Sequence, residues 1–590
     1  MSAGGQSNQT LTLPEMRIIL RTAVLALSAG CASVPAGQVG GSPSAASDRG
    51  PSPDTRPSDT RPSQPIPRPE QLYTPAEGRL SSEGLLIFPS RAPASGTQSP
   101  GPPGPLTSGD SPFTYVDSAL NLRVIYPRPR QVISVRDSTF LLGSVGSGAA
   151  KLTINGDTVP VNPNGSFLAW LPFPAGEAPK YDMVVARAAD TLRSTLEVAR
   201  PRPVPPALPV PLVIPDQPKF VELLNANEDA KSDTDFVAIA RPTQAGTYKW
   251  FLHAGTVVQV TGERNGWTRV RLDSALDAWV ESKYTKASDR TSNGRRTATN
   301  ARVLAAANGD RWTDLRIPIA SRVPFLVEQR ADALILTLYD AASNIDIINQ
   351  PTNDPSVRDV TWEQVTNERV RITVHLRHAP YGYLTMYTGG AFVLRVRHPP
   401  VVDRLRPLAG RVVAVDAGHP PIGSTGPTGL YEGDAVLAVA QALKPMLERA
   451  GATVIMTRSA AGAVALGERP IIARRADADV LVSIHLNAHP DGVNPLRNNG
   501  TGTYYFHAQA EPLAREVQRG MVKWMGLRDL GINYNNLALA RPTWMPSILC
   551  EGAFIIVPNQ EAALRTAEFQ SRYAIGVLEG LENYFRGLAQ

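Results

Sequence analysis

Two proline-rich stretches divide the chain of 590 residues and rule out one continuous core. Residues 32–112 consist largely of Pro, Ser, Gly, Arg and Thr with few apolar side chains, and a shorter stretch of this kind covers residues 200–218. Such segments bury too little apolar surface to offset the entropy lost when a chain becomes ordered. We therefore predict globular modules separated by disordered, locally extended linkers, in keeping with a length too great for one core.

The first 31 residues have the pattern of an export signal. Met16-Arg17 is followed by an apolar run ending at Leu27 and by small residues before Cys31. This resembles a bacterial lipoprotein signal, in which the cysteine is lipidated and attaches the protein to a membrane. By the same resemblance, Ala32 after the cysteine implies an outer-membrane lipoprotein facing the periplasm if the cell is Gram-negative. An ordinary cleaved signal is the alternative, and the polar stretch 1–15 makes Met16 the expected start.

Charge and cysteine content exclude two classes of protein. The net charge is +6, without a block of basic residues, so we expect no nucleic-acid partner. A mild positive balance is compatible with an anionic polymer. Only Cys31 and Cys550 occur, so the chain has no disulfide framework.

Alternating apolar residues in 113–199 predict β-strands. The Asn155-Gly156 and Asn164-Gly165 pairs lie between such runs and predict two hairpins. This segment looks like an immunoglobulin-like sandwich, and it carries no evident chemistry.

Two further β-rich segments precede the C-terminal part. Residues 219–290, with Trp267 and Trp279 in short strand-like runs, resemble a bacterial SH3-like barrel of the kind attached to cell-wall hydrolases. The alternative is that both tryptophans are core residues of some small barrel, and wall binding by this segment stays open. Residues 296–400 hold more strand-like runs and resemble the AMIN-type targeting domain.

The pattern changes to alternating strands and helices in residues 405–590, which predicts an α/β domain. The expected strands are 411–416, 452–457, 480–487, 503–506 and 547–551, and the expected helices are 434–450, 466–476, 512–525 and 561–585. In the strand 480–487, Ser483, His485 and Asn487 share one face because side chains alternate along a strand. A polar row on a buried strand needs partners.

Three more polar residues accompany that row. His419 follows the first strand, Glu432 stands just before the first helix, and Glu551 ends the last strand. His419, His485 and Glu551 thus fall at the carboxyl ends of strands, where open α/β sheets place their sites. Two imidazoles and one carboxylate, with one position left for water, form a recognised catalytic zinc set.

Four ordered motifs carry a family resemblance. They are Val415-Asp416-Ala417-Gly418-His419, Gly429-Leu430-Tyr431-Glu432-Gly433-Asp434, Ser483-Ile484-His485-Leu486-Asn487-Ala488 and Glu551-Gly552-Ala553-Phe554. Together they resemble the zinc-dependent N-acetylmuramoyl-L-alanine amidases, from about residue 411 to the end of the chain. The resemblance implies a mixed sheet of about six strands flanked by helices.

The resemblance also implies a site and a reaction. His419, Glu432 and His485 would hold Zn²⁺, and Glu551 would act as general base and then general acid for a zinc-activated water. The substrate would be peptidoglycan, cut between the lactyl group of N-acetylmuramic acid and the L-alanine of the stem peptide, in wall turnover or cell separation. Asn487 and Arg458 are candidate substrate contacts, although we expect Arg458, like Arg469, to be an exposed, solvated side chain.

The sequence departs from the family pattern at two places, and two alternative functions are kept as hypotheses. Pro420-Pro421 replaces the usual pair of glycines, and Gly433 replaces the usual lysine. Residues 489–501 are too few for the autoinhibitory helix of some relatives, so we do not expect self-blocking by a helix. A protein activator is a candidate partner, which the sequence itself does not reveal. The rivals are a non-catalytic peptidoglycan-binding lipoprotein and a zinc peptidase acting on another wall peptide bond.

Overall fold

The computed structural model describes residues 111–589 except 136, 203–208, 227–236, 291–295 and 306–310. The predicted export signal with Cys31 and nearly all of the first linker lie outside the described residues. No helix in the described part of the chain is both long and apolar enough to span a membrane.

Residues 123–197 form two antiparallel sheets around one core. The first contains β1 (Arg123–Tyr126), β2 (Ser138–Ser144) and β5 (Ser166–Pro172), and the second contains β4 (Asp157–Val159), β3 (Lys151–Ile154), β6 (Lys180–Arg187) and β7 (Asp190–Glu197), each in that order. Alternate side chains such as Leu152 and Ile154 are fully buried between the sheets. This arrangement accounts for the alternating sequence pattern.

One of the two Asn-Gly hairpin predictions is wrong. Asn155 and Gly156 have φ of 52° and 91° and close the β3–β4 hairpin, as predicted. The turn at Asn164-Gly165 instead joins β4 to β5, and these strands belong to different sheets. A turn dipeptide sets the local reversal, whereas the apolar pattern of the next strand selects its partner.

Residues 219–287 form a five-stranded sheet and a separate strand pair. The sheet order is β13 (Leu276–Glu281), β12 (Trp267–Asp273), β11 (Val257–Arg264), β8 (Lys219–Leu223) and β14 (Thr285–Ala287), and the pair is β9 (Val237–Ala240) with β10 (Trp250–His253). Part of the predicted second linker is ordered against this sheet, because Val213 exchanges two backbone hydrogen bonds with Glu263.

The tryptophans of this sheet are not core residues. Trp267 and Trp279 are only half-buried, and the guanidinium of Arg241 lies 4.9 Å from the Trp267 ring. Small aliphatic residues such as Val270 and Val280 fill the interior instead. The tryptophans in these short strand-like runs are therefore partly exposed aromatic side chains that lie against arginine.

Residues 296–397 form two larger sheets and one short pair. The strands are, in sheet order, β21 (Ile348–Asn349), β16 (Ala301–Ala305), β17 (Trp312–Pro318), β25 (Ala391–Arg397) and β24 (Gly382–Thr388), then β18 (Phe325–Arg330), β19 (Ala333–Tyr339), β23 (Arg369–Leu376) and β22 (Val357–Thr366), and the pair β15 (Arg296–Ala298) with β20 (Ala341–Ser343). Their core is continuous with that of β8 to β13, so one apolar cluster spans both segments.

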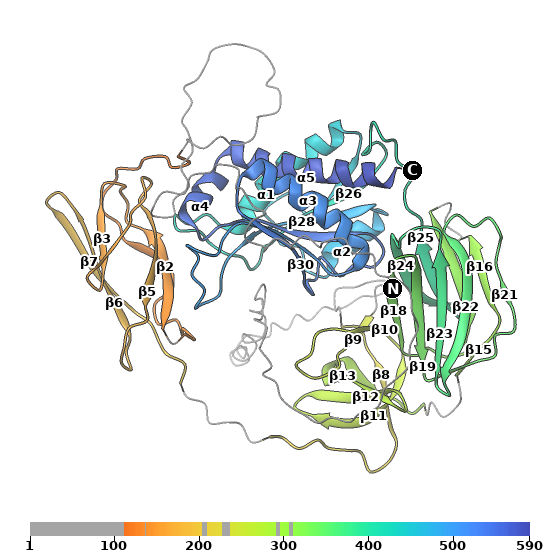
Figure 1. Cartoon of the computed structure of the whole chain (residues 1–590). Coiled ribbons are helices and arrows are strands. Elements are labelled where there is room, and N and C mark those ends of the chain that lie inside the picture. The colour runs from red at the N-terminus through yellow and green to blue at the C-terminus, as the bar shows by residue number, and fades with distance from the viewer. Residues whose placement is uncertain are drawn as a thin grey trace, which may run out of the picture. The chain divides into compact units, whose positions relative to one another are not determined.

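A mixed six-stranded sheet follows, as the family resemblance implies, with one strand more than the five predicted from the pattern (Figure 1). Its order is β27 (Thr453–Met456), β26 (Val412–Ala417), β28 (Val480–Asn487), β31 (Ser547–Phe554), β29 (Thr501–Tyr505) and β30 (Asp529–Tyr534). The first four strands are parallel, and β29 runs antiparallel to β31. The helices are α1 (Glu432–Arg449), α2 (Glu468–Arg475), α3 (Glu511–Met525), α4 (Pro558–Leu564) and α5 (Ala567–Leu588).

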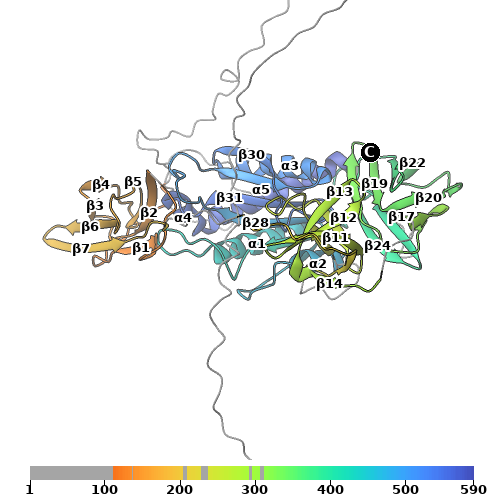
Figure 2. The ribbon, with the colours of Figure 1, turned by 90° about the horizontal axis from the view of Figure 1, so that it is seen from below.

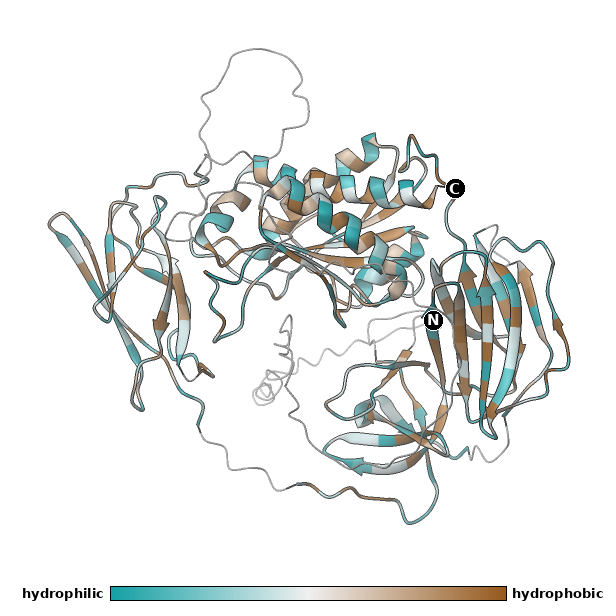
Figure 3. Ribbon diagram, in the orientation of Figure 1, coloured by the Kyte–Doolittle hydropathy of each residue, from teal (hydrophilic) through white to brown (hydrophobic). Residues whose placement is uncertain are grey.

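Both faces of this sheet are covered. Val480, Val482 and Ile484 pack in the main core with α1, α3 and α5, whereas Leu481 belongs to a smaller cluster on the other face that includes Ala473 of α2. The central strands are accordingly apolar along most of their length (Figure 3). Figure 2 shows the same domain after a rotation of 90°, with β28 and β31 next to each other.

Candidate metal centre

His419 lies just after β26, in an unusual backbone conformation. Its φ is 54°, in the left-handed region that residues with a side chain rarely adopt. Gly418 is required beside it, because a Cβ there would lie 2.5 Å from Nε2 of His485. The two imidazole rings cross edge to face, with 4.8 Å between their centroids.

Glu432 is the first residue of α1, because the helix begins two residues earlier than the predicted start at 434. Its carboxylate is fixed by the backbone: the Ser424 N–H donates to Oε2 at 2.9 Å, and the Leu486 N–H donates to Oε1 at 3.1 Å. An acidic group at a helix N-terminus also interacts favourably with the helix dipole. The side chain is 2 % exposed, so its orientation is well determined by its surroundings.

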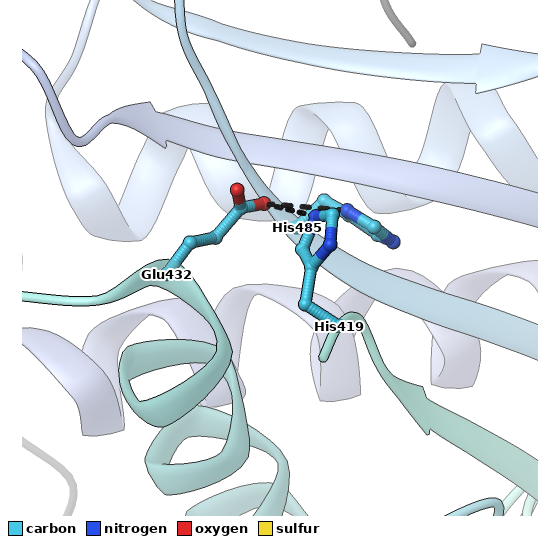
Figure 4. Close-up of side chains that lie close together, drawn as sticks. All are labelled: His419, Glu432 and His485. Carbon is cyan, nitrogen blue, oxygen red and sulfur yellow. Dashed lines mark ion pairs between the residues drawn. The ribbon is translucent and has the colours of Figure 1, made fainter. Parts of the chain in front are cut away.

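The two histidines converge on a single oxygen of Glu432. Oε1 lies 3.1 Å from Nε2 of His419 and 3.3 Å from Nδ1 of His485 (Figure 4). One donor atom from each of the three residues lies within 4.8 Å of the other two. Three segments far apart in the sequence thus meet at one point, as the motifs predict.

These distances suit a shared metal ion. Zinc bonds of about 2.0–2.1 Å in tetrahedral geometry separate neighbouring donor atoms by about 3.3 Å. Two imidazoles and a carboxylate are also donors that zinc accepts. The chemistry and spacing of this group therefore fit a divalent cation of the zinc type.

The charge of Glu432 is maintained despite its burial. Burial by itself would raise the pKa of this carboxyl, but hydrogen bonds and charge from His419 and His485 outweigh it and lower the pKa to about 2. The group is consequently a carboxylate at neutral pH, the form that a metal ligand requires.

Glu551 lies next to the histidine cluster. It is paired with His485 across the parallel strands β31 and β28, and it is 2 % exposed. Directly paired residues of neighbouring strands project to the same face. The strand does not end at Glu551 as predicted: it continues to Phe554, which pairs with Asn487 of β28.

The predicted substrate contacts differ in exposure. Asn487 is the last residue of β28 and is half-buried. Arg458 and Arg469 are 5 % and 3 % exposed, so the expectation of solvated arginines is wrong. Both side chains donate to backbone carbonyls of the loops that carry the candidate ligands.

Two groups that support these strands were not among the predicted site residues. Asp416 accepts hydrogen bonds from Arg469 and Ser483 and is fully buried. The Tyr573 hydroxyl donates to the backbone oxygens of Cys550 at 3.0 Å and His485 at 3.2 Å. Asp416 occurs within the first motif, whereas no local pattern marks Tyr573 in α5.

The model of the family described as N-acetylmuramoyl-L-alanine amidase matches residues 413–583. The chain is 31% identical over 192 residues to the uncharacterized protein YqiI of Bacillus subtilis, covering 32% of this chain and 90% of YqiI. It is also 31% identical over 193 residues to the N-acetylmuramoyl-L-alanine amidase LytC of the same organism, spanning 32% of this chain and 38% of LytC.

Among solved structures, the N-acetylmuramoyl-L-alanine amidase from Clostridium difficile 630 is similar at 32% identity, with 30% of this chain and 96% of that chain covered and a TM-score of 0.28. The match to the family model runs from β26 into α5, and YqiI is covered over nearly its whole length. The chain belongs to the N-acetylmuramoyl-L-alanine amidase family, and its C-terminal α/β domain is the amidase domain.

Proposed function

We propose that the chain is a zinc-dependent peptidoglycan hydrolase that cleaves the amide between the lactyl group of N-acetylmuramic acid and the L-alanine of the stem peptide. The observation that carries this proposal is the convergence of His419, Glu432 and His485 within 4.8 Å in a domain of the amidase family. Family membership supplies the choice of bond, because a ligand set alone does not select one amide.

The three ligands and Glu551 have separate roles in this proposal. Bound zinc would lower the pKa of water from 15.7 to about 7 and polarise the scissile carbonyl. Glu432 presents one oxygen to the ion while the Ser424 N–H holds the other. This fixed orientation keeps the donors spaced for one ion before substrate arrives.

Glu551 acts as the proton carrier. It takes a proton from the attacking water and delivers it to the nitrogen of the L-alanine as the amide breaks. Support comes from its place beside His485 in the strand pairing and from its near-complete burial. The products are a lactyl carboxylate on the glycan and a stem peptide with a free L-alanine amine.

The cellular setting belongs to the same proposal. An exported, lipid-anchored protein with Cys31 on the outer membrane would reach peptidoglycan from the periplasm. Wall turnover or cell separation is the role that such an enzyme would serve. The β-rich segments 219–290 and 296–400 would help to hold it on the wall as SH3-like and AMIN-like modules.

Mass spectrometry of the fragments released from purified peptidoglycan tests the reaction. With zinc, the full chain should release stem peptides whose N-terminus is L-alanine, and prior removal of metal with a chelator should abolish the release. Peptides with another N-terminus would favour a zinc peptidase instead. Intact peptidoglycan with a zinc-loaded chain would favour the non-catalytic binding protein.

A further inference from the structure

Arg458 is a buried cation that joins two of the candidate ligand segments. Its Nη2 donates to the carbonyl oxygens of Gly418 at 2.8 Å and Gly433 at 2.6 Å. Gly418 precedes His419, and Gly433 follows Glu432. One guanidinium thus sets the separation between the loop after β26 and the first turn of α1.

Arg469 in α2 donates hydrogen bonds to the loop that carries His419. Its Nη2 donates to the carbonyls of the left-handed residue His419 at 3.1 Å and of the following Pro420 at 3.2 Å. A rare backbone conformation persists only where surrounding contacts over-determine it. The planar fork of arginine suits this task, because it reaches several acceptors in a fixed geometry.

Asp416 completes the network. Its carboxylate accepts from Nη1 of Arg469 at 2.9 Å and from Oγ of Ser483 at 2.5 Å. Ser483 is on β28, two residues before His485 and on the same face. The buried polar network therefore reaches all three segments that supply a candidate ligand.

A third buried arginine lies away from the candidate ligands and serves as a comparison. Arg397 in β25 is fully buried and donates to the carbonyls of Ala478 at 2.7 Å and Trp544 at 3.0 Å. Neither carbonyl borders a candidate ligand. Arg397 also forms ion pairs with Asp477 at 3.1 Å and Asp479 at 3.5 Å, as Arg469 does with Asp416. All three arginines donate to backbone oxygens, and the acceptors of Arg458 and Arg469 alone among them lie beside candidate ligands.

We propose that Arg458 and Arg469 are positioning residues that hold His419 and Glu432 at the spacing required by the metal ion. This inference rests on the proposed zinc site. Without either side chain, the backbone beside a ligand would be less ordered. Part of the free energy of zinc binding would then be used to order that backbone, so the zinc affinity would fall.

Competition with a chromogenic zinc chelator, performed on the full chain, tests the proposal. Arg458→Met and Arg469→Met should each weaken zinc affinity by about 10–100-fold, the usual effect of losing a group that orients metal ligands. Arg397→Met is the matched control, with a buried guanidinium removed elsewhere. It should lower the melting temperature and leave the zinc affinity of the folded protein unchanged.

The conservative variant Arg458→Lys keeps the positive charge but lacks the planar guanidinium that reaches two carbonyls. Its zinc affinity should lie between those of the wild type and Arg458→Met. Circular dichroism shows which variants fold, and Arg458→Lys decides the question if Arg458→Met does not fold. If Arg458→Lys and Arg469→Met both bind zinc with wild-type affinity, the positioning role is contradicted, while the proposed function is unaffected. A wild-type chain that takes up no zinc would contradict the proposed function as well.

Discussion

Glu551 separates metal binding from bond cleavage at the scale of one side chain. Glu551→Gln removes the proton acceptor while the three candidate ligands stay in place. We expect the variant to bind zinc as tightly as the wild type and to release stem peptides about 10²–10⁴-fold more slowly. Zinc titration and the initial rate of peptide release from peptidoglycan measure the two effects.

The control for that substitution is Glu568→Gln, which changes an exposed glutamate on α5 that pairs with Arg572. It should leave both zinc affinity and rate unaltered. Peptide release by Glu551→Gln at the wild-type rate would remove Glu551 from the proposed mechanism.

The sequence predicted the residues that meet at the centre but not the groups that hold them. His419, Glu432 and His485 were identifiable because each occupies a distinctive motif near a strand or helix end. The bonds from Arg458 to the Gly418 and Gly433 carbonyls link residues 40 and 25 positions apart. Side chain to backbone contacts over such distances leave no periodic pattern to detect.

At the scale of elements, α4 secures the loop that leads into α1. Glu561 is fully buried, and its carboxylate accepts from the backbone N–H groups of Thr428 and Leu430 at 3.0 Å each. A Cβ at Gly426 would lie 2.6 Å from the Glu561 side chain, so the loop passes very close to it. This loop ends at Tyr431, directly before Glu432.

Glu561→Ala should therefore lower the free energy of unfolding by on the order of 2–4 kcal/mol, because it leaves several buried donors unsatisfied. Urea titration measures the change. Glu568→Ala offers a comparison at an ion pair whose carboxylate is exposed, where a loss below about 1 kcal/mol is expected. Equal losses in both variants would show that Glu561 does not anchor the loop.

Element boundaries were predictable where the chain is buried on both sides. The strand 480–487 was predicted with the bounds that β28 has, since apolar residues recur from Val480 to Leu486. β30 was missed because Asp529–Tyr534 is short, contains Gly531 with φ of 74°, and pairs with a neighbour on one side only. The extended conformation of an edge strand depends on pairing with its neighbouring strand more than on its own composition.

For the whole molecule, strand patterns did not reveal that two predicted modules share a core. His253 at the end of β10 is 7 % exposed and lies against Phe325, with 4.7 Å between the ring centroids, and against Tyr387 and Phe392. These three aromatic residues belong to the segment 296–400. Burial lowers the pKa of His253 from 6.5 to about 4.

This shift predicts a pH-dependent stability. His253 is neutral in the folded chain, whereas in the unfolded chain it takes up a proton below pH 6.5. Stability is thus fully present above pH 6.5 and falls as the pH decreases toward 4, by on the order of 3 kcal/mol from this residue. Urea unfolding at several pH values, followed by tryptophan fluorescence, measures it.

The variant His253→Leu removes the titrating group and should show a shallower loss of stability over the same pH range. An identical pH dependence in the variant and the wild type would mean that other groups cause it. Unfolding of the segments 219–287 and 296–397 in one transition is also expected, because one apolar cluster spans them.

The parallel pairing of β28 with β31 determines where the chain tolerates changes in length. Deleting one residue between Ser547 and Cys550 would turn the following carboxylate toward the opposite side of the sheet, away from His485. The connection 488–500 carries no such constraint, although it begins at the same edge. A segment inserted there would adjoin the centre without changing the register of β28 and β31, which makes this loop the natural place to add a switch.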